Sequence, residues 1–136
     1  MPVITRSQVI NAPIEEVFDA IVDCGNFASW NPTIRSSRRL DDRPPGDGAR
    51  FEWNLSGLGA VVMELQEFRR PDRVRIKAPT GGHRFALTAQ GRSTRVDHEL
   101  EIRPMGAMIV MAPIMGLIGR KNLKDTTNAL RAHLEK

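Results

Sequence analysis

The sequence of 136 residues has one cysteine, no tyrosine and no signal-peptide-like start. Because Cys24 has no second cysteine to pair with, an intrachain disulfide is excluded, which fits a reducing compartment. The start of the chain, from Met1 to Ser7, lacks the continuous apolar core of a secretory signal. We therefore expect a cytoplasmic protein.

Long hydrophobic runs are also missing. The most apolar stretch, from Met105 to Gly119, has 15 residues and is interrupted by Pro113 and by glycines. A membrane-spanning helix needs about 20 apolar residues. We expect this stretch to form a loop and the first turns of a helix over a cavity mouth, without stable membrane insertion. Contact with a membrane interface is the alternative.

Aromatic residues are scarce, at 5% of the chain, although the net charge is +4. A basic chain can indicate a nucleic-acid partner. Here the basic residues are scattered, and the densest pairs, Arg38–Arg39 and Arg69–Arg70, fall near expected strand ends or turns. Few aromatic rings are available for stacking on bases. No nucleic-acid partner is expected.

Signatures of metal and cofactor chemistry are absent. The three histidines, His83, His98 and His133, have no local ligand spacing, and Cys24 stands alone. No glycine-rich phosphate loop, nucleophile elbow or catalytic triad spacing is present. We expect neither a metal nor a cofactor.

The most informative segment that is present runs from Asn11 to Pro32. Asn11 is a candidate helix cap, and Pro13 suits a first helical turn. The next apolar residues have helical spacing, which predicts one short helix, and Trp30-Asn-Pro32 predicts the end of a second one.

Alternating segments separated by turn residues surround and follow these helices. The pattern of apolar residues facing in and charged residues facing out predicts an antiparallel sheet with one solvated face. The predicted strands are 3–10, 34–40, 49–56, 60–68, 73–78, 83–89 and 95–103.

The last segment, from Pro113 to Lys136, predicts a long amphipathic helix. Leu123, Thr127, Leu130 and Leu134 fall on one stripe of this helix. At 1.5 Å per residue it is long enough to cover the apolar face of the sheet.

This element order resembles the helix-grip fold of the START-like (birch-pollen-allergen-like, SRPBCC) superfamily, and the chain resembles its polyketide cyclase/dehydrase group. The resemblance is carried by Ile10-Asn-Ala-Pro-Ile-Glu-Glu-Val-Phe18, by Trp30-Asn-Pro32 and by the terminal helix after Pro113. It implies one α+β domain over residues 1–136, with a curved seven-stranded antiparallel sheet around a long C-terminal helix.

The resemblance also implies an elongated cavity between sheet and helix for a hydrophobic small molecule, such as a lipid, sterol, quinone or polyketide. Apolar residues at inward or lid positions are the candidates to line it, and methionines suit an adaptable pocket. The alternative is that they only form the core. The candidates are Trp30, Phe51, Trp53, Met63, Ile76, Phe85, His98, Met111, Met115 and Gly119.

Polar candidates are few. His98 lies at an inward position, where it could bond a ligand or move a proton, or simply be satisfied by a neighbouring group. Arg38 could point inward and hold an acid group. His83 is expected at a solvated strand end, and His133 near a helix C-terminus, where a cation is favourable.

Three functions remain open from the sequence. The first is a binding or carrier protein, monomeric or homodimeric, without chemistry of its own. The second is a cyclase or aromatase in which His98 or Arg38 moves protons. The third is a protein-interaction module that uses its basic outer face.

Overall fold

The computed structural model describes residues 3–42, 44–55, 59–79, 81–102 and 112–135. Two helical segments follow the first strand, and a long helix follows the last one. The elements are β1 (Val3–Ile10), α1 (Ile14–Val22), the 3-10 helix η1 (Cys24–Ser29), β2 (Ile34–Arg39), β3 (Arg50–Leu55), β4 (Gly59–Arg69), β5 (Arg73–Ala78), β6 (Gly81–Gln90), β7 (Ser93–Ile102) and α2 (Ala112–Leu134).

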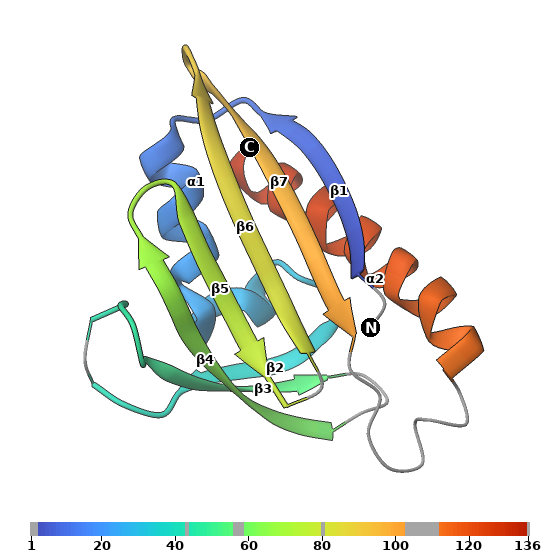
Figure 1. Cartoon of the computed structure of the whole chain (residues 1–136). Helices are drawn as coiled ribbons and strands as arrows, with labels where there is room; N and C mark the ends of the chain where they lie inside the picture. The colour runs from blue at the N-terminus through green and yellow to red at the C-terminus, as the bar shows by residue number, and fades with distance from the viewer. Residues whose placement is uncertain (1–2, 43, 56–58, 80, 103–111, 136) are drawn as a thin grey trace.

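Within these ranges the strands form one antiparallel sheet of seven strands, in the order β1-β7-β6-β5-β4-β3-β2 (Figure 1). Strands β2 to β7 are a meander, and β1 pairs with β7. Register shifts in β2 and between Gln66 and Arg69 of β4 bend the sheet, because bulges increase local twist. Both α1 and α2 lie on the same side of the curved sheet (Figure 1).

The alternation that predicts the strands is seen in their burial. In β7, Val96, His98 and Leu100 are buried, whereas Arg95 is exposed and Asp97 and Glu99 are half-buried. The outer face carries cross-strand ion pairs, which suits a face exposed to water. These pairs include Arg38–Glu52, Arg50–Glu64, Arg75–Glu101 and Arg84–Glu67.

Helix α1 begins directly after Pro13, with Glu15 and Glu16 in its first turn, where the helix dipole favours negative charge. The prediction that Asn11 caps this helix is wrong, because no side-chain cap bond is present at its N-terminus. Instead the Asn11 side chain accepts a hydrogen bond from Ser93 Oγ at 2.7 Å. Asn11 therefore ties the end of β1 to the β6–β7 hairpin.

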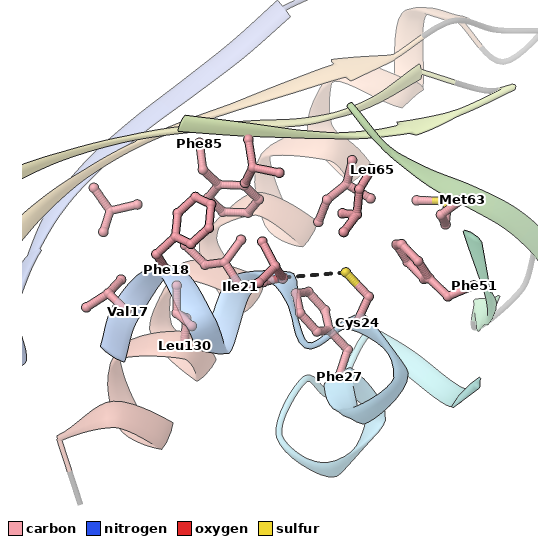
Figure 2. Close-up of a cluster of buried hydrophobic side chains, with 14 of the residues drawn as sticks. Val17, Phe18, Ile21, Cys24, Phe27, Phe51, Met63, Leu65, Phe85 and Leu130 are labelled. Carbon is pink, nitrogen blue, oxygen red and sulfur yellow. Dashed lines mark hydrogen bonds between the residues drawn. The ribbon is translucent and has the colours of Figure 1, made fainter. Parts of the chain in front are cut away.

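The main core lies between α1, η1 and the sheet (Figure 2). The apolar stripe of α1 is fully buried, and its Phe18 meets Phe68 edge to face with centroids 5.2 Å apart. Leu130 of α2 belongs to this cluster. A second, smaller cluster forms where the other part of α2 meets β7, from Leu100, Ile102 and Leu123 with Ile4.

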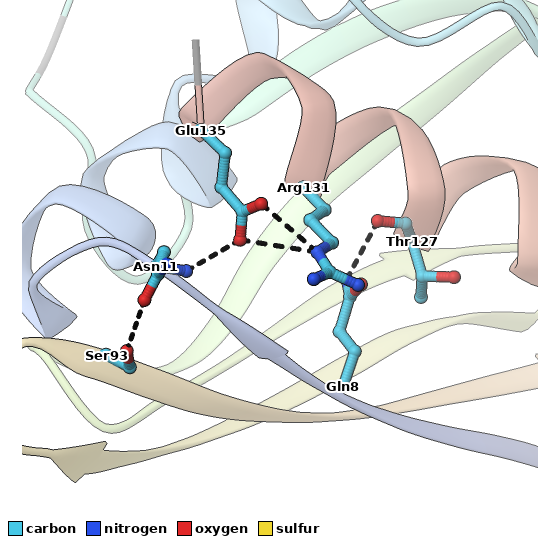
Figure 3. A network of polar contacts seen from close by, with 6 residues as sticks. All are labelled: Gln8, Asn11, Ser93, Thr127, Arg131 and Glu135. Carbon is cyan, nitrogen blue, oxygen red and sulfur yellow. Dashed lines mark hydrogen bonds and ion pairs between the residues drawn. The ribbon is translucent and has the colours of Figure 1, made fainter.

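Helix α2 is attached to β1 through polar contacts (Figure 3). Gln8 Nε2 donates to the carbonyl of Thr127 at 2.8 Å. The backbone N–H of Asn11 donates to Glu135 at 2.8 Å, and this bond, aided by Arg131, lowers the pKa of that carboxyl. The apolar stripe expected from the sequence faces inward, since Leu123, Thr127 and Leu130 are buried.

The predicted helix-grip architecture is therefore confirmed: a curved antiparallel sheet holds a long C-terminal helix, and two short helices follow the first strand. No helix in the described part of the chain is both long enough and apolar enough to span a membrane. Of the Met105–Gly119 stretch, residues 112–119 form the first turns of α2, as predicted, and residues 105–111 lie outside the described residues.

Candidate functional site

A cavity of about 140 Å³ lies where the two apolar clusters approach each other. Protein interiors are close-packed and leave few voids larger than a water molecule, so a space of this size requires an explanation. Its wall comes from η1, β2, β3, β4, β5, β6, β7 and α2, and we call it the central pocket. Its apolar wall includes Phe27, Ile34, Trp53, Met63, Phe85, Leu100 and Ile102.

Fixed backbone and ring contacts shape this wall. Trp53 stacks on Phe27 with ring centroids 4.8 Å apart, and its indole N–H donates to the carbonyl of Cys24 at 3.0 Å. On the α2 side, Gly119 lies so close to the sheet that an added Cβ would stand 2.4 Å from Ile102 Cδ1. The aromatic wall is thus locked to η1, and the helix approaches the sheet where it lacks a side chain.

Polar groups interrupt the apolar wall at a few points. Asn31 is buried, and its Oδ1 accepts from the backbone N–H and the hydroxyl of Thr33. Its Nδ2 reaches Thr126 Oγ1 at 3.4 Å, a long contact. Asn122 and His83 also line the pocket. Apolar walls with a few placed polar groups are typical of small-molecule sites.

Two histidines meet at the sheet side of the pocket. His83 Nδ1 lies 2.8 Å from His98 Nε2, on adjacent strands β6 and β7. Phe85 stacks on the His98 ring with centroids 4.2 Å apart. His83 is half-buried and lines the pocket, whereas His98 is buried behind it. We call these two residues the histidine pair.

Burial determines the charge of the histidine pair. Desolvation lowers the pKa of His83 from 6.5 to about 4. Desolvation, and secondly the charge of His83, hold the pKa of His98 well below its usual value. Both imidazoles are therefore neutral at pH 7.

The remaining titratable groups of the region are less suited to chemistry. Glu101 borders the pocket, but its carboxylate contacts Arg75 at 3.5 Å. Burial, and secondly Asp23, raise the pKa of the Cys24 thiol well above its usual value, so this thiol is a poor nucleophile. Among the described side chains, no group of three His, Cys, Asp or Glu could hold a metal ion.

The residues proposed from the sequence to line a cavity fall into three groups. Trp53, Met63, Phe85 and Gly119 border the central pocket. The others that the structure describes pack beside it or behind its wall, and Trp30 is half-buried against Phe27. This second group is Trp30, Phe51, Ile76 and His98. Met111 lies outside the described residues, as does the side chain of Met115.

Two expectations about polar residues require correction. Arg38 does not point inward: its side chain is 68% exposed and pairs with Glu52 on the outer face. His83 is not at a solvated strand end, because β6 already begins at Gly81 and places His83 on the pocket wall. His133 lies in the last turn of α2, as expected, and stacks on Trp30.

The sequence-based interpretation missed the polar part of the pocket: Asn31, Thr33, Asn122, Thr126 and His83. A signal for two of them was present. Thr126 follows Leu123 by three residues and precedes Leu130 by four, which places it on the buried stripe of the helix. For His83, the inward position two residues before Phe85 was a better guide than its place directly after Gly81 and Gly82.

Comparisons with known proteins agree with this architecture. The family model described as polyketide cyclase / dehydrase and lipid transport matches residues 1–135. A search of the curated proteins finds no match.

Solved structures with the same fold cover nearly the whole chain. A START superfamily protein from Mycobacterium smegmatis has a TM-score of 0.78 at 15% identity, covering 98% of this chain and 97% of its own. A protein from Thermus thermophilus has a TM-score of 0.81 at 17% identity, with the same coverage.

The di-domain ARO/CYC protein of the BE-7585A biosynthetic pathway has a TM-score of 0.72 at 16% identity. That match covers 99% of this chain and 50% of the di-domain chain. At such low identities these likenesses show the fold alone.

Proposed function

This chain belongs to the polyketide cyclase/dehydrase and lipid transport family, and we propose that it binds a compact hydrophobic molecule in the central pocket. The observation that carries the proposal is the unfilled, mainly apolar space of about 140 Å³ between the two core clusters. Leaving such a space empty sacrifices packing contacts, which a bound apolar molecule would restore.

The size of the pocket limits the ligand. An engineered apolar cavity of about 150 Å³ in another protein stays dry and binds benzene. By the same measure, the central pocket suits one six-membered ring with a short substituent. A long lipid chain would have to displace side chains or extend past the described wall.

A cyclase or aromatase activity in the same pocket is the second candidate, because a neutral imidazole, that of His83, lies on the wall. Its pKa of about 4 makes it a weak base at neutral pH, where a pKa near 7 would serve better. The other titratable group on the described wall, Glu101, is engaged by Arg75. Binding without chemistry is therefore the preferred function.

The interaction-module hypothesis has less support. Several arginines on the outer face form ion pairs with neighbouring carboxylates, such as Arg38 with Glu52 and Arg84 with Glu67. A face with its charges matched in this way has less positive charge to offer an acidic partner.

A cavity-filling variant tests the proposal. Ala78 is buried on the pocket wall, so Ala78→Leu would occupy the space that a ligand needs. We use ethylbenzene as the probe and follow the melting temperature and the methyl NMR signal of Met63. At a free concentration ten times its dissociation constant, ethylbenzene should raise the free energy of unfolding of the wild type by about 1.4 kcal/mol. Ala78→Leu should abolish this response.

The control is Ala89→Leu on β6, which makes the same substitution at an exposed position. It should retain the wild-type response to ethylbenzene. Absence of any response in the wild type, or an equal response in Ala78→Leu, would contradict binding in the central pocket.

A further inference from the structure

The histidine pair gives the central pocket a directional hydrogen-bonding group. Because the Nδ1 atom of His83 is used on His98 at 2.8 Å, Nε2 is the remaining ring nitrogen of His83. No partner for His83 Nε2 is found among the described residues, and this atom is not enclosed. Since His83 lines the pocket, a ligand is the group best placed to meet that nitrogen.

The buried end of the pair indicates which ring donates. His98 Nδ1 is enclosed and has no hydrogen-bond partner among the described residues. If His83 Nδ1–H donated, the neutral His98 would carry its proton on Nδ1, as a buried N–H without an acceptor. If His98 Nε2–H donates, His98 Nδ1 is only an unused lone pair. Orphaned buried N–H groups are the rarer of the two defects in proteins.

This direction of donation fixes the other ring. When His83 Nδ1 accepts from His98 Nε2–H, a neutral His83 must carry its own proton on Nε2. The pocket then presents an N–H donor. His98 acts as a positioning residue, because its hydrogen bond selects the tautomer of His83.

The charge of the wall excludes another class of ligand. Of the described residues that line the pocket, Glu101 is the one with a formal charge, and its carboxylate points to the outer face of the sheet. Arg75, its partner, is held at 3.5 Å in that ion pair. An anionic ligand would therefore lose its hydration without gaining a counter-ion, which is unfavourable.

We propose that the ligand is an uncharged aromatic or alicyclic ketone, quinone or similar carbonyl compound, whose oxygen accepts a hydrogen bond from His83 Nε2–H. This inference depends on the proposed function, since it names the class of molecule held in the same pocket. A hydrocarbon would fill the space but leave the donor unpaired, and a carboxylate would find no counter-ion on the described wall.

Three single-ring probes of similar size separate these classes: acetophenone, ethylbenzene and benzoate. Their dissociation constants are measured by NMR titration for the wild type and for His83→Leu. A carbonyl left without its donor in this mainly apolar pocket loses roughly tenfold in affinity. We therefore expect His83→Leu to weaken acetophenone about tenfold and ethylbenzene less than about twofold. Benzoate should bind the wild type at least about tenfold more weakly than acetophenone.

Two further variants test the positioning role of His98. His98→Phe removes the donor to His83 and should weaken acetophenone selectively. His98→Gln keeps an amide donor and should restore part of that affinity. Arg38→Gln, at an exposed position on the outer face, is the control and should leave all three affinities unchanged.

A measurement on the wild-type protein tests the inference even if a histidine variant does not fold. Nitrogen-15 NMR of the imidazoles should show both rings protonated at Nε2, and acetophenone should shift the His83 Nε2–H signal more than ethylbenzene does. Protonation of His83 at Nδ1 would overturn the inference, as would equal effects of His83→Leu on both neutral probes or equal binding of benzoate. If neither neutral probe binds the wild type, the proposed function itself fails.

Discussion

The two ring nitrogens of His98 lie in different surroundings, and only one of them is hydrogen-bonded within the described residues. Nε2 meets His83, whereas Nδ1 is enclosed without a partner among the described residues. A buried polar atom left unsatisfied destabilises a fold by about 1–3 kcal/mol. The chain retains it on a strand where alternation would accept an apolar residue, which suggests a role beyond packing.

The histidine pair predicts a pH dependence of stability. The native pKa of His83 is about 4 and that of the unfolded chain is near 6.5. The full stability is therefore present above pH 6.5 and is lost as the pH falls toward 4, because the unfolded state takes up the proton first. Between pH 6.5 and 5, we expect the titration of His83 alone to lower the free energy of unfolding by about 1–2 kcal/mol. The titration of His98 should lower it further.

Urea unfolding at a series of pH values measures this loss. The double variant His83→Phe/His98→Phe should flatten the dependence between pH 6.5 and 5, where carboxylates contribute little. Arg38→Gln should keep the wild-type slope. A double variant with the full wild-type slope would show that other groups are responsible.

The sequence predicted the orientation of some of these side chains correctly and of others wrongly. Alternation along β7 correctly predicted that His98 faces inward. His83 was misplaced because Gly81-Gly82 resembles a turn, whereas these glycines already pair with Ile102 and Glu101 in the sheet. Arg38 was misplaced because the register shift in β2 is not visible in the sequence.

At the scale of elements, the start of β6 depends on a close approach between two backbones. Gly82 has φ of +153°, and a Cβ at this position would stand 2.2 Å from the carbonyl oxygen of Ile76. The neighbouring atom belongs to the β5 main chain, so it cannot move aside as a flexible side chain would. This approach sets the position of the residue that follows, His83.

We therefore expect Gly82→Ala to destabilise the protein by about 3 kcal/mol or more, from backbone strain and the collision with β5 together. Gly91→Ala is the matched control: its φ is +65° but nothing lies within 4 Å of the added Cβ, so about 1–2 kcal/mol is expected. Urea unfolding compares the two. Equal losses in both variants would argue against the steric account.

Most elements could be predicted from the sequence, because strands with one solvated face carry a clear period of two. The contacts at the N-terminus of α1 could not be predicted in this way. Asn11 has the right chemistry for a cap, but its side-chain oxygen accepts from Ser93 of the β6–β7 hairpin, and its backbone N–H donates to Glu135 at the end of α2. These contacts depend on residues more than 80 positions away, which local rules do not include.

For the whole molecule, α2 is the element that joins both apolar clusters. Leu130 is 2% exposed and packs with the main core, while Leu123 packs with Leu100 and Ile102. The same helix lines the central pocket with Gly119, Asn122 and Thr126. Docking of α2 and closure of the pocket are therefore one event.

Leu130→Ala tests this dependence. Removal of a buried leucine side chain should lower the free energy of unfolding by about 2–5 kcal/mol. Leu117→Ala, at a position in the same helix that is 68% exposed, should change it by less than about 0.5 kcal/mol. Chemical denaturation measures both. Similar small effects would mean that α2 is not held by the main core.

The pocket was the part of the molecule that the sequence described least. Inward periodicity finds residues that face the interior, but it does not separate those that touch one another from those that border a void. Trp53 and Phe51 have the same pattern on β3, yet Trp53 lines the pocket and Phe51 lies behind it. That distinction depends on how the bent strands and α2 meet.

The strand order has a consequence for synthesis of the chain. From β2 to β7 each strand emerges next to its partner in the sheet, so hairpins can form one after another as the ribosome releases them. The first strand has no such neighbour, because Ser7 pairs with Asp97, 90 residues later. A nascent chain must therefore carry β1 unpaired until nearly the whole sheet has left the exit tunnel, so the backbone polar groups of β1 wait longest for their partners.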